Sequence, residues 1–278
     1  MKKINRRSFL AAAGLTVAAL ALTACGGSAS STASSAASSA ASSEAASTSA
    51  AAELTTVEAG KLTMATNAAF PPYEMTTDAG EFEGIDIDTA KAIAEKLGLE
   101  LQIDDMDFDA ALLSVQQGKA DIVMAGVTVT DERKAVMDFS DSYATGIQSI
   151  IVPEGSDITS PDDLAGKKIG TQRGTTGYIY CSDDFGDDAV VAYDNGLTAV
   201  QALNNGQVDA VVIDNAPAKE FVAANPGLVI LDTSYAEEDY AIGLAKGSSL
   251  EDAVNAALEE LKADGTLQSI VDKYITAE

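Results

Sequence analysis

The chain has 278 residues, a formal net charge of −26 and no histidine; its length suits about two compact units. The negative charge argues against nucleic acid and against an anionic membrane surface as partners. Without histidine, Ser-His-Asp and Cys-His nucleophile systems are excluded, and the commonest metal ligand is missing. Carboxylates could hold calcium, but no D-x-D-x-D-G loop occurs, so neither a metal site nor a cofactor is expected.

Residues 1–24 are typical of an export signal. Basic residues within positions 2–7 precede an apolar run from Phe9 to Leu22, which is too short to span a bilayer comfortably as a helix. The stretch NRRSFL at residues 5–10 also looks like a twin-arginine signal, which leaves the export route open. Residues 26–53 are almost wholly Ser and Ala, so residues 25–53 are expected to form a flexible tether.

Cys25 closes the sequence LTAC, which resembles the lipobox of bacterial lipoproteins. The alternative is a chance cysteine after an ordinary signal. Diacylglycerol on Cys25 would supply two acyl chains, enough to anchor the protein stably at the outer face of the cytoplasmic membrane, as in Gram-positive bacteria. The remaining cysteine, Cys181, has no partner for an internal disulfide and is expected to be a small buried side chain.

From Lys61 onward, short apolar runs alternate with stretches of helical periodicity, which predicts an α/β protein with parallel-type sheets. One helix is expected to begin at Asp86 or Asp88 and to end at Gly98, and another to carry a capping box from Ser248 to Glu251. The predicted strands are Leu62–Thr66, Leu99–Ile103, Ile122–Ala125, Lys168–Gln172, Ala189–Tyr193, Ala210–Ile213 and Leu228–Leu231.

A faint internal repeat links two parts of the chain. A shift of 88 residues lays ALLSVQQGKADIVMAG (residues 111–126) on AVQALNNGQVDAVVID (residues 199–214). Both copies show a helix, a glycine stop, an aspartate and a buried strand, which predicts two similar lobes. Gly126 and Asp214 then occupy equivalent positions beyond the carboxyl end of a strand, where open parallel sheets bind ligands. Asn67 and Gln172 end the first strand of each lobe.

Charged and polar residues near these strand ends indicate a ligand with both a carboxylate and an ammonium group. Thr130 suits a helix N-cap, whereas Arg133 opposes the helix dipole; it is either a bidentate carboxylate ligand or an exposed surface arginine. The turn GTQRGTTG could present amides to an anion or simply connect a strand to a helix. Asp214 could bind an ammonium, cap a helix starting near Pro217, or do both. An α-amino acid fits this pair of charges.

Several longer stretches resemble one protein family: TNAAFPPYE, GIDIDTAKAIAEKLG, MDFDAALLSVQQGKADIVMAGVTVTDERK, DFSDSY, GTTG, VVIDNAP and LKADGTLQSIVDKYI. They are similar to the polar amino-acid receptors of bacterial ABC importers, the solute-binding family that includes glutamine, histidine and cationic amino-acid receptors. The resemblance runs from about Leu62 to the C-terminus. It implies a two-lobed type II periplasmic-binding-protein fold that closes on its ligand and hands it to a membrane permease.

The resemblance also implies roles for particular residues. Arg133, Thr128 and the Thr175/Thr176 turn would hold the α-carboxylate, and the Gly126 backbone and Asp214 the α-ammonium. Phe70 and Phe108 would stack on the side chain, with core packing as the alternative. Receptors for cationic amino acids usually place an acid at the position of Asn67, so a neutral polar ligand is expected. The full expected ligand-binding set is Asn67, Phe70, Tyr73, Phe108, Ala125, Gly126, Thr128, Arg133, Gln172, Thr175, Thr176 and Asp214.

Two crossover strands are expected, near Ala144–Ile147 and near Ser234–Tyr240. They divide the folded part into lobe 1 (residues 54–145 and 240–278) and lobe 2 (residues 146–239). The leading hypothesis is a lipid-anchored, non-enzymatic amino-acid receptor, monomeric by default. The alternatives are a small-carboxylic-acid dehydratase with Asp214 as its acid or base, and a sensory or adhesive receptor that has the same pocket but no permease.

Overall fold

A computed structural model describes residues 54–275 of the chain. The predicted signal segment, tether and Cys25 lie outside the described residues. None of the helices among the described residues is long and apolar enough to cross a membrane.

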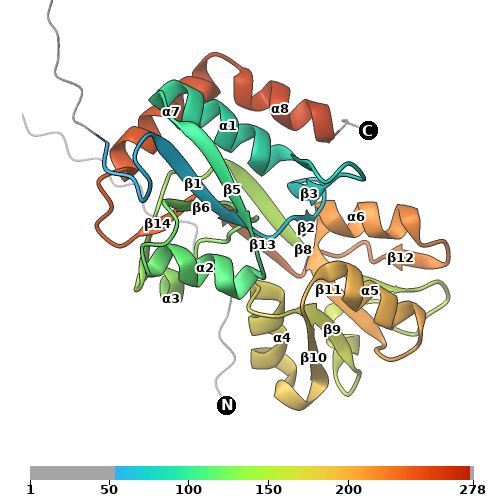
Figure 1. The fold of residues 1–278 in the computed structure, drawn as a ribbon. Helices are drawn as coiled ribbons and strands as arrows, with labels where there is room; N and C mark the ends of the chain where they lie inside the picture. Colours follow the sequence, from blue (N-terminus) through green and yellow to red (C-terminus); the bar gives the residue numbers. More distant parts are fainter. Residues whose placement is uncertain (1–53, 276–278) are drawn as a thin grey trace, which may run out of the picture. The chain divides into compact units, whose positions relative to one another are not determined.

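The first lobe is built on a five-stranded sheet with the order β5-β1-β6-β14-β7. Three helices cover one face of this sheet and α2 covers the other (Figure 1). The strands are β1 (Lys61–Thr66), β5 (Glu100–Asp105), β6 (Ile122–Val123), β7 (Met137–Phe139) and β14 (Gly243–Ala245). The helices are α1 (Ile85–Leu97), α2 (Phe108–Gln116), the short α3 (Asp131–Lys134), α7 (Glu251–Ala263) and α8 (Thr266–Tyr274). A small sheet of β2 (Ala69–Phe70), β3 (Glu74–Thr76) and β4 (Phe82–Glu83) lies between β1 and α1 in the chain.

The second lobe has the sheet order β10-β9-β11-β8-β12, with β13 also paired to β8. Its strands are β8 (Ala144–Pro153), β9 (Ile169–Gln172), β10 (Val190–Tyr193), β11 (Ala210–Asp214), β12 (Leu228–Ile230) and β13 (Ala236–Tyr240). Its helices are α4 (Thr176–Phe185), α5 (Gly196–Asn204) and α6 (Asn215–Ala224), with 3-10 turns at Pro161–Leu164 and Asp187–Ala189. Cys181 is fully buried under the sheet beside Val212, as predicted.

The chain passes between the lobes twice, along β8 and β13. These strands pair antiparallel, from Ala236 opposite Gln148 to Tyr240 opposite Ala144. They coincide with the segments predicted to cross over, and the two-lobed α/β fold is confirmed. The lobe boundaries at residues 145/146 and 239/240 stay a prediction.

The expectation of parallel-type sheets was only partly right. β1 pairs parallel with β5 and β6, and β9 pairs parallel with β10 and β11. β14 and β8, however, run antiparallel to their neighbours. These strands adjoin the two crossings, so they enter each sheet from the opposite direction. Both sheets are therefore mixed.

The predicted strands and helices occur with small shifts, but the capping box was wrong. α7 begins at Glu251 itself, so Glu251 cannot occupy the third position of the helix. Ser248 Oγ accepts a hydrogen bond from the amide of Leu250, two residues away. A turn before the helix therefore uses the serine. Gly98 does end α1, with a positive φ of 69°.

The two copies of the repeat have the same backbone hydrogen bonds. In the first copy, the amides of Gly118 and Lys119 donate to Val115 and Ser114. In the second, the amides of Gly206 and Gln207 donate to Leu203 and Ala202, which are the equivalent positions. Asp121 accepts a hydrogen bond from the backbone amide of Thr63, and the equivalent Asp209 accepts one from the backbone amide of Lys168. The predicted structural repeat is confirmed.

Candidate functional site

One cavity lies where the carboxyl ends of strands from both lobes meet. Its volume is about 310 Å³, counting the part open to solvent. The wall is formed by Asn67, Phe70, Glu74, Phe108, Ala125, Gly126, Thr128, Arg133, Gln172, Thr175, Thr176 and Asp214. Eleven of the twelve residues expected to bind ligand are in this wall. Their roles in binding remain predictions.

Tyr73 is the exception, because it does not line this cavity. The chain turns after Phe70, whose carbonyl accepts a hydrogen bond from the Tyr73 amide. The Tyr73 ring stacks on Phe70 with centroids 6.0 Å apart and meets Tyr240 edge-on at 5.2 Å. Tyr73 therefore supports Phe70 from behind and is a core residue.

Arg133 is buried, with 8% of its surface exposed, so the alternative of an exposed surface arginine is wrong. Thr130 caps α3 by accepting a hydrogen bond from the Arg133 amide, as predicted. The guanidinium donates to the carbonyl of Thr128 at 2.8 Å and, across the lobes, to that of Gly174 at 3.1 Å. It also lies 5.4 Å from the centroid of the Phe108 ring. Burial lowers the pKa of Arg133, which the negative charge of Glu238 opposes. Since its hydrogen-bond partners here are neutral carbonyls, its charge is available to a carboxylate.

Asp214 is buried at the end of β11, with 7% of its surface exposed. It stands at the N-cap position of α6, but its side chain makes no capping hydrogen bond. One carboxylate oxygen, Oδ2, accepts from the Gln148 amide at 2.8 Å, while the buried Oδ1 has no hydrogen-bond partner among the described residues. Burial raises the pKa of Asp214 to about 7, and the nearby Glu238 adds to the rise. The capping alternative is therefore wrong, and an unsatisfied buried acid remains.

Glu74 is a wall residue that the sequence analysis did not assign. It is fully buried at the start of β3, and its carboxyl group lies close enough to that of Asp86 to share a hydrogen bond. Glu74 forms no ion pair within the described part of the chain. Burial raises the pKa of Glu74 well above its usual range, and the negative charge of Asp86 adds to this. Glu74 closes the motif TNAAFPPYE, so an acid at the end of an otherwise apolar and aromatic stretch was the signal available in the sequence.

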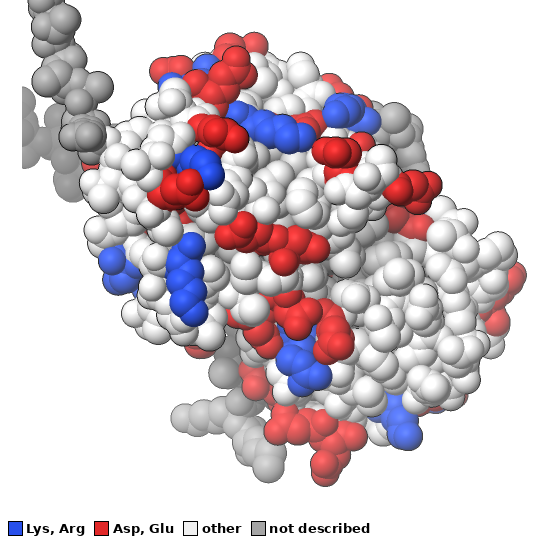
Figure 2. Space-filling view, viewed as in Figure 1, with Lys and Arg blue, Asp and Glu red and all other residues white. Residues whose placement is uncertain are grey.

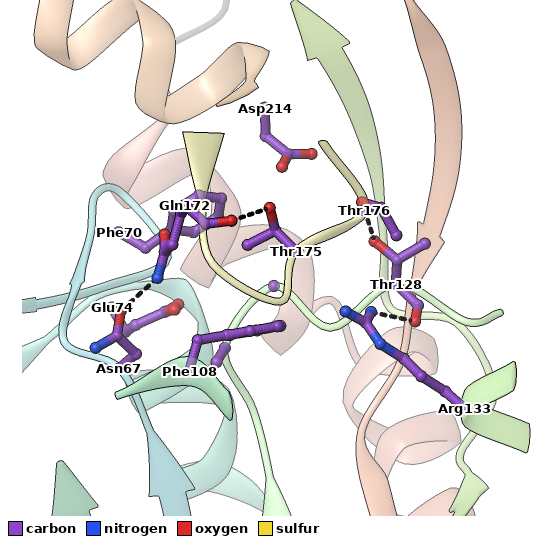
Figure 3. A pocket seen from close by; sticks show the side chains of 12 residues that line it. Asn67, Phe70, Glu74, Phe108, Thr128, Arg133, Gln172, Thr175, Thr176 and Asp214 are labelled. Carbon is purple, nitrogen blue, oxygen red and sulfur yellow. Dashed lines mark hydrogen bonds between the residues drawn. The ribbon is translucent and has the colours of Figure 1, made fainter. Parts of the chain in front are cut away.

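The cavity has two polar ends (Figure 3). Asn67, Glu74 and Gln172 lie together at one end, and Thr128, Thr176 and Arg133 lie at the other. The side-chain amide of Gln172 donates a hydrogen bond across the lobes to the Asn67 Oδ1 atom at 2.9 Å. The helix α4 begins at Thr176, after the N-cap Thr175, so partial positive charge from its first amides lies beside the cavity. These two residues thus belong to a turn that can receive an anion.

Asp86 anchors the Gly126 loop from behind. Its carboxylate accepts from the Gly126 amide at 2.9 Å and from the Tyr143 hydroxyl at 2.7 Å, just before the crossing strand β8. Burial raises the pKa of Asp86 to about 6. The Gly126 backbone has φ of 55°, and a Cβ atom there would lie 2.8 Å from the Phe70 ring. Glycine at this position therefore allows Phe70 to pack against the loop.

Within residues 54–275, no three acidic or cysteine side chains gather closely enough to hold a metal ion. The chemistry that the wall offers is recognition of charge at both ends of a small molecule.

Comparison with known proteins assigns a family to this architecture. Residues 62–277 match the bacterial extracellular solute-binding proteins, family 3. A probable histidine-binding protein of Neisseria gonorrhoeae is 33% identical over 99% of this chain and 98% of its own. An ancestral arginine-binding protein, solved with glutamine and with arginine, is 43% and 44% identical. These two structures cover 79% and 78% of this chain and 100% and 98% of their own, with TM-scores of 0.75 and 0.74. The chain therefore belongs to the bacterial extracellular solute-binding proteins, family 3, and is a non-enzymatic binding protein.

Proposed function

We propose that this solute-binding protein captures an L-amino acid with a cationic side chain and delivers it to the permease of an ABC importer. The observation that carries the choice of side chain is Glu74, a fully buried acid in the cavity wall that has no basic partner among the described residues. A relative described as a probable histidine-binding protein, and structures of an ancestral arginine-binding protein with glutamine and with arginine, support an amino acid as the ligand.

The main-chain groups of the amino acid account for two of the three charges in the wall. The α-carboxylate pairs with Arg133 and the first amides of α4, and the α-ammonium pairs with Asp214. Arg133 belongs to the first lobe, whereas α4 and Asp214 belong to the second. A bound amino acid would therefore contact both lobes and favour the closed arrangement through contacts that an open form lacks. This leaves Glu74 at the other end.

A cationic side chain satisfies Glu74. A zwitterion with a neutral side chain would leave that buried carboxyl unpaired, which is costly. Phe70 and Phe108 line the wall, and aromatic side chains favour a planar guanidinium, so arginine is the first candidate. Acidic side chains also gather near the middle of the face shown in Figure 2. A surface hollow beside Phe108 is lined by Asp107, Asp109 and Asp194 together with Arg173. The excess of negative charge in this hollow attracts a cation.

A neutral polar ligand such as glutamine is the second candidate, because Asn67 and Gln172 present amides at the same end of the cavity. Asn67 by itself favours this neutral ligand. An amide ligand would require Glu74 to stay protonated, which its raised pKa permits. The two candidates differ in their dependence on the charge at Glu74.

The remaining features of the proposal concern the setting of the protein. Cys25 would carry a lipid that holds the chain at the outer face of the cytoplasmic membrane, and the tether would let a monomeric head reach its permease. Dehydratase activity is not part of the proposal, since the family is non-enzymatic. A sensory role would use the same ligand without a permease.

The test compares ligands and variants by calorimetry and thermal unfolding of protein that has been unfolded and refolded to remove carried-over amino acid. A ligand at 100 times its Kd adds about 2.7 kcal/mol, which for a chain of this size raises Tm by roughly 5 to 11 °C. We expect L-arginine to produce this shift. Glu74→Gln should weaken arginine by about 30-fold or more, since a buried charge pair is broken, and should leave glutamine binding unchanged or improved.

Glu81→Gln is the matched control, because it removes the same charge from an exposed residue close in the chain. It should leave both affinities unchanged. Equal arginine affinity in Glu74→Gln and the original protein would refute the cationic side chain. Failure of every common amino acid to bind folded protein would refute the receptor itself.

A further inference from the structure

Three hydrogen bonds converge on one buried carboxylate behind the cavity. Glu238 lies in the crossing strand β13 with 7% of its surface exposed and is not part of the cavity wall. Its Oε2 atom accepts from the hydroxyls of Thr128 at 3.2 Å and Thr176 at 2.9 Å, and from the Gln148 amide at 2.9 Å. The donors come from lobe 1, lobe 2 and the other crossing strand, β8. Glu238 therefore joins both lobes at the point where the chain passes between them.

These bonds fix what the two threonines can offer a ligand. A hydroxyl has one hydrogen to donate and lone pairs to accept with. The two hydroxyls lie 3.5 Å apart, and the Thr176 oxygen also accepts from the Gln148 amide at 3.4 Å. With both hydroxyl hydrogens directed to Glu238, the remaining lone pairs face the cavity that the threonines line. Lone pairs attract N–H groups and repel a carboxylate. This corner therefore suits an ammonium group, and the role of carboxylate ligand expected for the Thr128 hydroxyl does not fit.

Gln148 links this corner to Asp214. Its amide nitrogen donates to Glu238 at 2.9 Å and to Asp214 at 2.8 Å. Two buried acids thus share one neutral amide, and the Oε1 of Glu238 and Oδ1 of Asp214 have no partner in the described part of the chain. A positive group placed between the threonines and Asp214 would compensate this negative charge.

We propose that Glu238 is a positioning residue for the ligand α-ammonium: it orients the hydroxyls of Thr128 and Thr176 as acceptors and supplies a second negative charge behind Asp214. The inference rests on the proposed amino-acid ligand and adds a residue that does not touch it. Because Glu238 accepts from both lobes at once, the ammonium site is complete only when the lobes are closed.

The charge of Glu238 should also appear in the pH dependence of binding. An ammonium needs ionised Asp214, so affinity falls as pH drops through the pKa of that group, which is about 7 in the ligand-free protein. Removing the negative charge of Glu238 lowers this pKa and moves the fall to lower pH. Other ionisable groups around Asp214 are Tyr240 on β13, Tyr73 before β3, Glu74 in β3, and Lys219 and Glu220 on α6. The buried guanidinium of Arg133 also interacts with the charge of Glu238.

The experiment measures the Kd of L-arginine between pH 5.5 and 8.5 for three variants of the protein. Glu238→Gln should weaken binding about tenfold at pH 8 and shift the midpoint of the pH profile down by about 0.5 to 1 unit. Glu238→Asp keeps the charge but withdraws it from the hydroxyls, so it should weaken binding by a similar factor without moving the midpoint. Glu237→Gln, an exposed neighbour on the same strand, should change neither.

Each outcome decides between roles. If Glu238→Gln lowers affinity equally at every pH, Glu238 is only a structural residue and the inference is overturned. If Glu238→Asp binds arginine with the original affinity, the hydrogen bonds from the two hydroxyls are not needed and the inference is overturned. This second test does not depend on whether Glu238→Gln folds. If the unsubstituted protein binds glutamine and not arginine, the cationic side chain fails, and the same series with glutamine tests Glu238. If it binds neither, the proposed function fails first.

Discussion

The two copies of the repeat, residues 111–126 and 199–214, share a helix, a glycine turn and a strand, yet they end in different chemistry. The first copy ends at Gly126, whose φ of 55° and missing side chain let Phe70 approach. The second ends at Asp214, a buried acid with an unsatisfied oxygen. One framework thus presents backbone in one lobe and negative charge in the other. The framework positions the last residue of each copy, and the identity of that residue decides what this part of the lobe presents to the cavity.

The largest effect is expected from removing the charged end of the second copy. Asp214→Asn should weaken amino-acid binding by 2 to 5 kcal/mol, or about 30- to 4,000-fold, because the ligand ammonium would be buried without a counter-charge. Calorimetry at pH 8 measures this loss. Asp209→Asn makes the same substitution at an exposed residue of the same copy and should keep the affinity. Similar affinities in the two variants would rule out Asp214 as the ammonium ligand.

The aspartates inside the two copies should differ in their effect on stability. Asp121 is buried and accepts from the amides of Val57 and Thr63, whereas the exposed Asp209 accepts from that of Lys168. Asp121→Asn should lower the free energy of unfolding by about 2 kcal/mol, because it disturbs two hydrogen bonds to a buried carboxylate. Asp209→Asn should lower it by less than about 1 kcal/mol, because this exposed carboxylate accepts one. Urea unfolding measures both. Equal losses of unfolding free energy would mean that the two aspartates contribute equally to stability, against this expectation.

Alanine substitutions at two glycines of the first copy distinguish the effect of backbone strain from the effect of contact with the pocket. Gly118 and Gly126 both have positive φ, but a Cβ atom on Gly118 would meet nothing within 4 Å. Gly118→Ala and Gly126→Ala should each cost about 1 kcal/mol of stability. Only Gly126→Ala should also weaken ligand binding, by about tenfold, since its methyl group displaces Phe70. Titration of both variants with arginine tests this, and a loss of affinity in Gly118→Ala would contradict it.

The smallest effect is the pH dependence of the ligand-free protein. Asp214 and Asp86 have pKa values of about 7 and about 6, above the ordinary 3.8. Folded protein therefore binds protons that the unfolded chain releases, and stability falls as pH rises from about 5 to 7. Tm should be higher at pH 6.5 than at 7.5 by about 2 to 4 °C, or about 1 kcal/mol. Asp214→Asn should reduce this difference, and a Tm that rises with pH would contradict the assigned shifts.

Much of the site could be predicted because it depends on local order along the chain. Strand ends at Asn67, Gln172 and Asp214 were readable from apolar runs that stop at a polar residue, and parallel strands bring their carboxyl ends to one edge. Glu74, Gln148 and Glu238 were missed because each lies in an extended segment whose partners are distant in sequence. The buried face of such a segment is decided by the sheet it joins. Tyr73 was assigned to the cavity for the converse reason, since an aromatic residue near a strand end can face the ligand or the core.

The sequence by itself determined the alternation of strands and helices, the repeat and the polar residues that end its strands, because these follow from short-range periodicity and turn chemistry. Tertiary structure alone decided the antiparallel strands of each sheet, the core position of Tyr73, and the meeting of Thr128, Thr176 and Glu238. Those features depend on two chain crossings that bring residues more than 100 positions apart into contact, as with Thr128 and Glu238. No local pattern encodes which side chains meet there, since the packing of both lobes fixes it.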